Sequence, residues 1–299
     1  MKETTKSSLA IEGKNVEVNG VFPRIAKLRS EHHEYVEAPE SALREIASLK
    51  PKADIFTFLQ PIAQEGSSST YLSRPEDIAV LTIDTYENWW TKQVNDKTRN
   101  MVRKAGKKGA TIQIVPFNDD LAKGIHAIYN ESPLIQGKPS KHYGKDLATL
   151  TKAHATFLDQ SLFIGAFYNG ALIGFLKMIL HRNQRSASIM QIISLVAHRD
   201  KAPTNALLAK AVEVCAERRI RYLQYGIWSR RTLGEFKKHH GFKLMTIPRY
   251  YVPLNLRGRA ALALRFHRRL SEFVPGGWQD VFANLRAKWY LFKYRANAI

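Results

Sequence analysis

The sequence predicts an α/β fold: a mixed β-sheet flanked by helices, with a smaller N-terminal α/β module and a basic helical C-terminal tail. Three observations support this prediction. Apolar runs rich in Ile and Val alternate with segments of helical periodicity over residues 186–254. The dipeptide Asn169-Gly170 separates two apolar runs, as in a β-hairpin. Residues 256–299 combine helically spaced apolar side chains with many arginines.

The central prediction is one crossover unit. Residues 186–196 form an apolar run typical of a buried strand, and residues 206–219 have apolar side chains at helical spacing. A short strand over 220–225 and a second helix closed by Gly241 follow. Because such crossovers are right-handed, the two strands should lie parallel. A ligand is then expected at the carboxyl end of the first strand, against the following helix N-terminus.

The N-terminal module, residues 1–84, should contain several short strands and one helix. Strands are predicted over 16–28, 33–36, 53–58 and 78–83, and a helix over 40–49. The Ser-rich stretch 64–70 is typical of a loop. The adjacent His32 and His33 are interpreted as a surface feature, because no acidic or Cys ligands accompany them at metal-site spacing.

A long helix is predicted over 85–109, connecting the module to the rest of the chain as residues 85–110. Its second half carries six cations: Lys97, Arg99, Arg103, Lys104, Lys107 and Lys108. One interpretation is a solvated face. The other is a phosphate-binding ridge, because clustered cations repel one another unless an anion lies nearby. On the second interpretation Arg103 and Lys104 contact substrate.

Residues 111–255 form the main domain. A strand over 111–116 precedes a helix that starts at Asp119 and stops before Pro133. A polar loop with Glu131, His142 and Tyr143 follows, then a helix over 146–158. The hairpin pairs 161–167 with 171–180, and 243–254 is the closing strand.

Composition limits the class of protein. The chain of 299 residues is 44% hydrophobic and 24% charged, which is ordinary for a soluble globular protein. Its net charge of +20 favours anionic partners such as nucleic acid, anionic lipid or phosphorylated carriers. The lone Cys215 lies on the apolar face of a predicted helix and should be a core residue. The sequence shows no signal peptide and no long apolar run, so we expect a cytoplasmic protein, with the tail as a possible membrane contact.

Two short patterns resemble known families. The order strand, Arg199-x-x-Ala202-x-Thr204, helix, strand, helix is similar to the core of the GNAT acyltransferases, which hold the coenzyme A pyrophosphate at this turn. The segment Phe236-Lys237-x-x-x-Gly241 resembles the signature of Fem-type aminoacyltransferases, a GNAT branch that modifies cell-wall precursors. The likeness covers residues 111–254.

The resemblance implies roles for particular residues. Arg199, Lys201, Thr204 and Asn205 would hold the donor phosphates. Backbone amides around Ile193, Ser194 and Leu195 would bind the donor carbonyl and stabilise the oxyanion, so Ser194 is placed among the catalytic residues. Lys237 would position the donor, and Glu131 would take the acceptor's proton as general base. Glu131 has a second interpretation as a local capping or ion-pairing group. His142 and Tyr143 would contact the acceptor.

The expected function is acyl transfer to an amine or hydroxyl of a cell-envelope or polysaccharide precursor, either a small molecule or lipid-linked. Acyl-CoA, such as acetyl-CoA, is the expected co-substrate, and no metal is required. Two alternatives stay open. One is an aminoacyl-tRNA-dependent transferase or RNA-binding protein. The other is a peripheral membrane or scaffold protein with a degenerate core, which Pro203 favours because it has no N–H to donate. Residues 256–299 are predicted to contact an anionic membrane surface, with packing on the main domain as the alternative.

Overall fold

A computed structural model describes residues 9–48, 52–62, 71–135, 138–181, 185–229 and 232–266. The chain divides into two compact units that alternate along the sequence. The first unit comprises Met1–Trp89, Leu180–Ser188 and Cys215–Arg268, and the second comprises Trp90–Ile179, Ile189–Val214 and Arg269–Ile299. The predicted Ser-rich loop 64–70 and most of the predicted tail lie outside the described residues.

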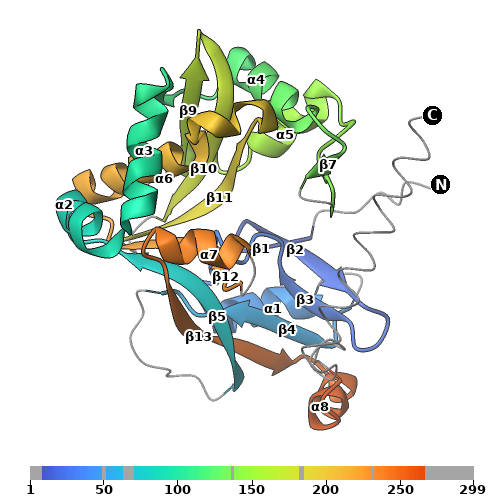
Figure 1. Ribbon diagram of the computed structural model, residues 1–299. Helices are drawn as coiled ribbons and strands as arrows, with labels where there is room; N and C mark the ends of the chain where they lie inside the picture. Colours follow the sequence, from blue (N-terminus) through green and yellow to red (C-terminus); the bar gives the residue numbers. More distant parts are fainter. Residues whose placement is uncertain are drawn as a thin grey trace. The chain divides into compact units, whose positions relative to one another are not determined.

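The first unit is built on a mixed sheet whose strand order is β1-β2-β3-β4-β13-β5-β12-β11 (Figure 1). Its strands are β1 (Leu9–Ile11), β2 (Lys14–Asn19), β3 (Ile25–Leu28), β4 (Ile55–Leu59), β5 (Leu72–Thr82), β12 (Tyr222–Ile227) and β13 (Lys243–Pro253). Its helices are α1 (Pro39–Ser48), α2 (Tyr86–Asn88), α7 (Thr232–His239) and α8 (Leu256–Ala263). A core of side chains from α1 and the first four strands includes Ile46, Phe56 and Phe58.

Two strand predictions in the first unit are wrong. The stretch 16–28 is an antiparallel hairpin, β2 and β3, because Gly20 at φ +89° and Pro23 interrupt the extended run. Residues 33–36 are in a turn and the loop after it, because Tyr35 and Val36 pack into the core from that loop. The predicted strands near β4, β5 and β13 are present, although β5 begins at Leu72, earlier than expected.

The second unit contains the sheet order β11-β10-β9-β6. Its strands are β6 (Thr111–Val115), β9 (Ser161–Tyr168), β10 (Ala171–His181) and β11 (Ser186–Ser194), with a separate pair β7 (Leu134–Ile135) and β8 (Lys138–Pro139). Its helices are α3 (Asp96–Lys107), α4 (Asp119–Tyr129), α5 (Leu147–His154) and α6 (Pro203–Glu217), with 3₁₀ turns η2 (Leu158–Gln160) and η3 (Val196–Lys201). Strands β10 and β11, and helix α6, contribute residues to both units.

Helices cover both faces of this part of the sheet. Phe175 of β10 packs in a cluster with side chains of α4 and α5, including Ile125 and Leu150. A Cβ on Gly174, the residue before Phe175, would point to the opposite face, where Leu207 of α6 lies 3.3 Å from that position. Buried Cys215 of α6 confirms the prediction of a core cysteine.

The predicted long helix over 85–109 is interrupted. Thr85 caps α2, a π-helical turn η1 (Trp89–Gln93) follows, and a new helix α3 starts after Asn95. The break occurs because the Asn95 side chain accepts a hydrogen bond from the Thr98 N–H at 2.8 Å, which is an N-cap. The cationic half of the predicted helix therefore becomes a separate amphipathic helix.

The crossover prediction is confirmed. Strand β11 pairs parallel with β12, and α6 connects them. Their registered pairing covers only Ser186–Ser188 against Tyr222–Gln224. The Asn169-Gly170 hairpin is also confirmed, with β9 and β10 antiparallel and both turn residues at positive φ.

Candidate functional site

A cationic surface forms in the second unit where α3 packs beside η3. Lys104 of α3 and Lys108, the residue that caps its C-terminus, lie close enough to Asp200 of η3 for their charges to act on its carboxylate. The pKa of Asp200 is lowered, first by a hydrogen bond from Lys201 and then by these charges. Arg199 and Lys201 are the basic neighbours on the turn. Residues predicted separately from two sequence segments, Lys104 and the turn 199–201, are therefore brought together.

Lys201 is held in place on this surface. Its ammonium group lies 3.2 Å from Asp200 Oδ1 and 4.5 Å from the centre of the Tyr168 ring. A cation over an aromatic face is stabilised by the ring quadrupole. Arg199 is exposed, and Arg103 is exposed beside the Trp90 ring, 5.4 Å from its centre. Arg199 and Arg103 are thus presented to solvent, whereas the Lys201 side chain is held largely buried between Asp200 and Tyr168.

The turn between η3 and α6 has the geometry of a helix start. Ala202 adopts a left-handed conformation with φ +52°, and Pro203 is the first residue of α6. Proline is favoured at this position because the first helical N–H has no partner within the helix. The absence of an N–H at Pro203 is therefore a normal helix feature, and it carries less weight for a degenerate core than the sequence suggested.

The end of β11 is tied to its neighbours. Ser194 Oγ lies 3.0 Å from Thr204 Oγ1, and the Leu195 N–H donates to the Ile173 carbonyl at 2.9 Å. The Asn205 N–H donates to the Ala202 carbonyl at 3.1 Å. These contacts use the Leu195 amide, one of the groups predicted to bind a donor carbonyl. Ile193 packs with Leu195 against the α4 and α5 core.

Glu131 is bound to backbone amides in this structure. Its carboxylate accepts from the Val196 N–H at 2.6 Å and from the Ala197 N–H at 2.8 Å. These are the first two amides of η3, which have no partner within the turn, so the carboxylate stabilises its start. This arrangement is the local capping role that the sequence left open. The general-base role stays a prediction.

The predicted acceptor loop contains a partly buried His142. Its ring stacks on Tyr129 with centres 4.2 Å apart and planes 13° apart. Burial, followed by the charges of Lys145 and Lys141, lowers the pKa of His142. The neighbouring Tyr143 is exposed. His142 is therefore fixed against the core of the second unit, and Tyr143 faces solvent.

Beneath His142 lies a buried polar cluster that sequence reasoning missed. The Tyr129 hydroxyl lies 3.2 Å from His154 Nε2, and burial lowers the pKa of His154 to about 4. Lys177 Nζ donates to the carbonyls of His154 and Thr156 at 2.9 and 2.6 Å. Burial lowers the pKa of Lys177 to about 8. The detectable signal was a single lysine inside the apolar run of β10.

Lys237 lies in the first unit. Its ammonium group donates to the carbonyls of Tyr225 and Ile227 at 2.5 and 2.8 Å and lies 4.6 Å from the Tyr225 ring centre. These carbonyls flank Gly226, where the pairing of β12 with β5 shifts register. Burial lowers the pKa of Lys237 to about 8. The predicted donor lysine thus holds a bulged strand end immediately after the parallel pairing stops.

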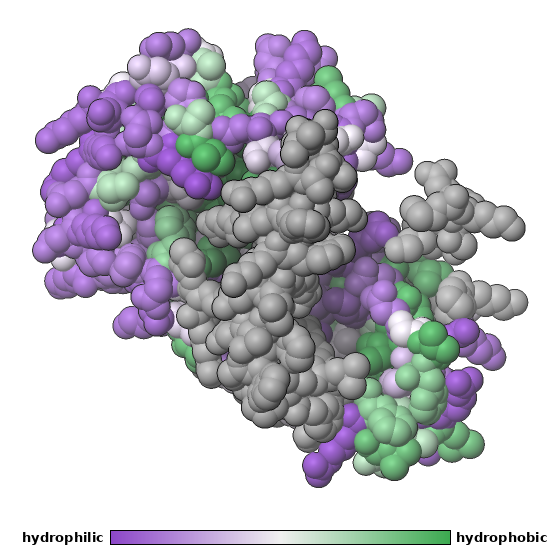
Figure 2. All heavy atoms as spheres, turned by 45° about the vertical axis from the view of Figure 1, so that its right-hand side comes forward, coloured by the Kyte–Doolittle hydropathy of each residue, from purple (hydrophilic) through white to green (hydrophobic). Residues whose placement is uncertain are grey.

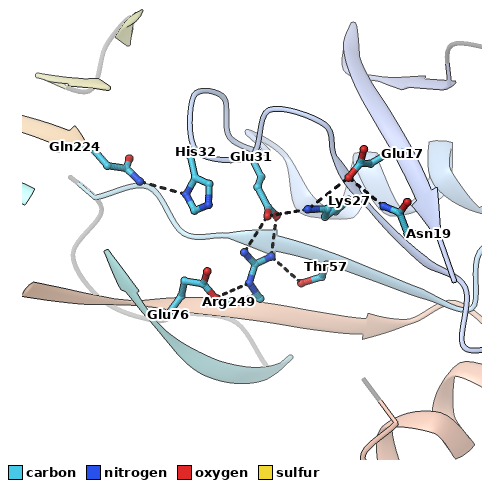
Figure 3. A network of polar contacts seen from close by, with 9 residues as sticks. All are labelled: Glu17, Asn19, Lys27, Glu31, His32, Thr57, Glu76, Gln224 and Arg249. Atoms are coloured by element: carbon cyan, nitrogen blue, oxygen red, sulfur yellow. Dashed lines mark hydrogen bonds and ion pairs between the residues drawn. The ribbon is translucent and has the colours of Figure 1, made fainter. Parts of the chain in front are cut away.

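A second set of unpredicted residues lies in the first unit. Figure 3 shows Arg249 of β13 forming a bidentate pair with Glu31 at 2.8 and 3.1 Å and a further contact to Glu76 at 3.1 Å. The burial that would lower the pKa of Arg249 is outweighed by these carboxylates, which raise it. Lys27 extends the network to Glu31 at 3.2 Å. The network joins the loop after β3 to the sheet.

His32 and His33 are bound to the sheet. His33 Nδ1 lies 2.8 Å from Ser188 Oγ, and His32 Nδ1 lies 3.4 Å from the Gln224 amide. Ser188 and Gln224 are registered partners in the parallel pairing of β11 and β12. The two consecutive histidines therefore match two paired strand residues. The interpretation of His32 and His33 as a surface feature did not predict these contacts, because the contacts depend on the register of β11 and β12.

The predicted site residues are thus divided. Lys237 belongs to the first unit, and the other predicted residues belong to the second. Within the described ranges, no group of three or more His, Cys, Asp or Glu side chains is placed to hold a metal ion. No helix in the described part of the chain is both long and apolar enough to cross a membrane.

Comparison with solved structures settles the fold. The C-terminal domain of a putative lysylphosphatidylglycerol synthetase from Agrobacterium fabrum matches with a TM-score of 0.53 and 14% identity, over 84% of this chain and 87% of that one. The chain has the GNAT fold. L-PGS from Bacillus licheniformis matches with a TM-score of 0.52 and 13% identity, over 88% of this chain and 89% of that one. FemX matches with a TM-score of 0.50 and 11% identity, over 77% and 72%.

The likeness to FemX, at 11% identity, is one of fold. No protein-family profile matches the chain, and no curated protein matches it in sequence. At these identities the comparisons show the fold alone, which is mixed α/β and GNAT-like.

Proposed function

We propose that this protein transfers an acyl or aminoacyl group from a phosphate-bearing donor to an amine or hydroxyl of a cell-envelope or polysaccharide precursor. The GNAT fold supports the reaction class. Transfer requires that a nucleophile on the acceptor lose its proton and that the donor carbonyl oxygen be stabilised as charge develops. In this proposal Lys237 acts on the donor side, and the loop with His142 and Tyr143 faces the acceptor.

One observation carries the proposal: the cations of α3 and of the turn before α6 form one surface. Lys104 and Lys108 act on Asp200 between Arg199 and Lys201. A phosphate-bearing donor would interact with these four cations together, because phosphate accepts several charge-assisted hydrogen bonds. Acyl-CoA, including acetyl-CoA, carries such phosphates.

A second candidate donor is aminoacyl-tRNA. The exposed cations continue along α3 to Lys97 and Lys107. A helix of 12 residues is roughly 18 Å long at 1.5 Å per residue, several times the length of a pyrophosphate. A polynucleotide backbone matches a cationic surface of this length better than a single diphosphate does.

The acceptor proposal draws on the names of the similar structures. Lysylphosphatidylglycerol, in the name of the Agrobacterium protein, joins an aminoacyl group to an anionic phospholipid. Transferred to this chain, that name supports an acceptor with a lipid-linked or otherwise anionic group. The net charge of +20 is suited to such an acceptor.

The test is donor binding by calorimetry with acetyl-CoA, a long-chain acyl-CoA and aminoacyl-tRNA in parallel. We expect one donor class to bind, and the K104Q/K108Q double variant to weaken that binding by about thirtyfold, since each of the two cations at a phosphate contributes on the order of 1 kcal/mol at low salt. The transfer reaction is then followed with the same donor labelled in its acyl group.

The matched control is K123Q/K152Q, which removes two exposed lysines of α4 and α5 elsewhere in the second unit. It should bind the donor as the native protein does. If none of the three donors binds to folded protein, the proposal is wrong and the degenerate-core alternative is favoured. If both double variants weaken binding equally, the surface on α3 and η3 is not the donor site.

A further inference from the structure

An exposed apolar patch lies at one end of the first unit. Val21 and Phe22, in the turn between β2 and β3, are 87% and 45% exposed. Leu256 at the start of α8 is 78% exposed. Leu264 and Phe266, just after α8, are exposed as well. Exposed aromatic and large aliphatic side chains gathered in one place mark interaction sites on soluble proteins.

The two segments belong to one patch because their side chains touch. The Phe22 and Phe266 rings meet edge to face with centres 6.0 Å apart. The Arg257 guanidinium of α8 lies 5.3 Å from the centre of the Phe22 ring. Figure 2 shows hydrophobic surface gathered into separate patches among hydrophilic side chains. The patch is therefore formed by tertiary contact between residues more than 200 positions apart in the chain.

The charge around the patch has one sign. Arg24 follows the turn, and Arg257, Arg259 and Arg265 lie along α8 and just beyond it, all of them exposed. Neither segment, 20–24 or 255–266, contains an acidic residue. Asp54, the acid nearest to Arg257, is buried and accepts from the Arg24 N–H and from Asn255. The exposed apolar side chains and the arginines thus belong to the same two segments, and these segments contain no carboxylate.

An open surface pocket adjoins the patch at the end of α8. It has a volume of about 420 Å³ and is lined largely by apolar and aromatic side chains, among them Tyr71, Leu72, Tyr251 and Leu262. Leu262 and the neighbouring Ala263 come from the end of α8, so the pocket adjoins the helix that carries the arginines.

We infer that the patch of Val21, Phe22, Leu256, Leu264 and Phe266, with its arginines, binds the surface of an anionic lipid membrane. Apolar side chains enter the boundary between headgroups and acyl chains, and arginines pair with the lipid phosphates. The surface therefore has both of the interactions that hold a peripheral protein on anionic lipid. This inference does not depend on the proposed transfer activity.

Two other occupants are disfavoured by charge. The segment 267–299 contains six Lys or Arg residues and two acids, so it has the same sign as the patch. A second copy related by a two-fold axis would place the same arginines against one another. Anionic lipid is the partner whose charge complements the patch.

The test is cosedimentation of the full chain with vesicles of phosphatidylcholine alone and of phosphatidylcholine with phosphatidylglycerol. We expect binding only to the anionic vesicles and weaker binding as salt is raised. The V21S/F22S double variant should weaken binding by about tenfold, because it removes inserted apolar surface. The R24Q/R265Q double variant should weaken it by about thirtyfold, because two charges leave the surface.

Two control variants test whether vesicle binding depends on this patch or on exposed apolar and cationic side chains in general. I114S removes a similarly exposed apolar side chain on β6, and K123Q/K152Q removes two exposed cations of the second unit. Both should bind vesicles as the native protein does, and thermal melting confirms that every variant is folded. Equal loss in the controls, binding indifferent to phosphatidylglycerol, or no vesicle binding at all would each overturn the inference. Because no acyl donor is present, none of these outcomes bears on the transfer reaction.

Discussion

Lys237 in the first unit and Lys177 in the second are buried in almost the same way. Each donates to two backbone carbonyls, each lies over an aromatic ring, and burial lowers the pKa of each to about 8. The carbonyls differ. Lys177 binds those of His154 and Thr156, where α5 ends. Lys237 binds carbonyls in β12 beyond the residues that pair with β11.

The difference shows that burial and a lowered pKa do not by themselves identify a functional lysine. Cations are favoured at helix C-termini, so Lys177 is explained by helix capping. Lys237 instead stabilises an irregular strand end, where backbone carbonyls would otherwise lack donors. The position in the fold, not the side-chain environment, separates the two.

The largest effect should come from exchanging these lysines for methionine. K237M should lower turnover about a hundredfold if the lysine serves the donor, a loss of the size seen for an electrostatic contact at a reacting group. K177M should leave turnover of the folded protein within about threefold. Both should lose about 2 kcal/mol of unfolding free energy, because carbonyls are left without donors.

Turnover is measured with the donor that binds, and stability by urea unfolding. Equal losses of turnover in both variants would remove the functional distinction between the lysines. Native turnover in K237M would assign Lys237 a purely structural role.

The next effect is a loss of stability at acid pH that both units should share. Burial lowers the pKa of His181 and His240 in the first unit, and of His154 in the second, from 6.5 to about 4. The unfolded chain therefore binds protons that the native state does not between pH 6.5 and 4. The stability is fully present above pH 6.5 and is lost as pH falls towards 4, by on the order of 3 kcal/mol per histidine.

Substitution of one of two adjacent histidines tests this. H240Q removes a buried imidazole of the first unit and should flatten the fall in stability between pH 6.5 and 4. H239Q removes its exposed neighbour and should leave the slope as in the native protein. Urea unfolding at a series of pH values gives both slopes, and identical slopes in the two variants would refute the assignment to His240.

The smallest effect concerns Glu131. In E131Q the carboxylate loses its charge but retains one oxygen acceptor for the Val196 and Ala197 amides, so stability should fall by about 1 kcal/mol. If the residue only caps η3, turnover should change less than tenfold. A fall of two to four powers of ten at unchanged donor affinity would establish it as the general base. E235Q on α7, an exposed carboxylate paired with Lys238, serves as the control.

Much of the fold was predictable because its signals are local. The Asn169-Gly170 turn has positive φ at both residues, which few other dipeptides tolerate. This dipeptide was therefore enough to predict the hairpin. The crossover of β11, α6 and β12 followed from a change of apolar period. The break before α3 was missed, although Asn95 carries the signal of an N-cap.

The sequence by itself determined the α/β class, the crossover unit, the buried Cys215 and the cations of α3, because periodicity and composition depend on neighbouring residues. Only the tertiary structure decided what those residues meet. It placed Lys104 beside Asp200, set His32 and His33 on the registered pair Gln224 and Ser188, and joined Phe22 to Phe266. These contacts span long stretches of chain, and their partners are chosen by strand register and packing, which no local pattern encodes.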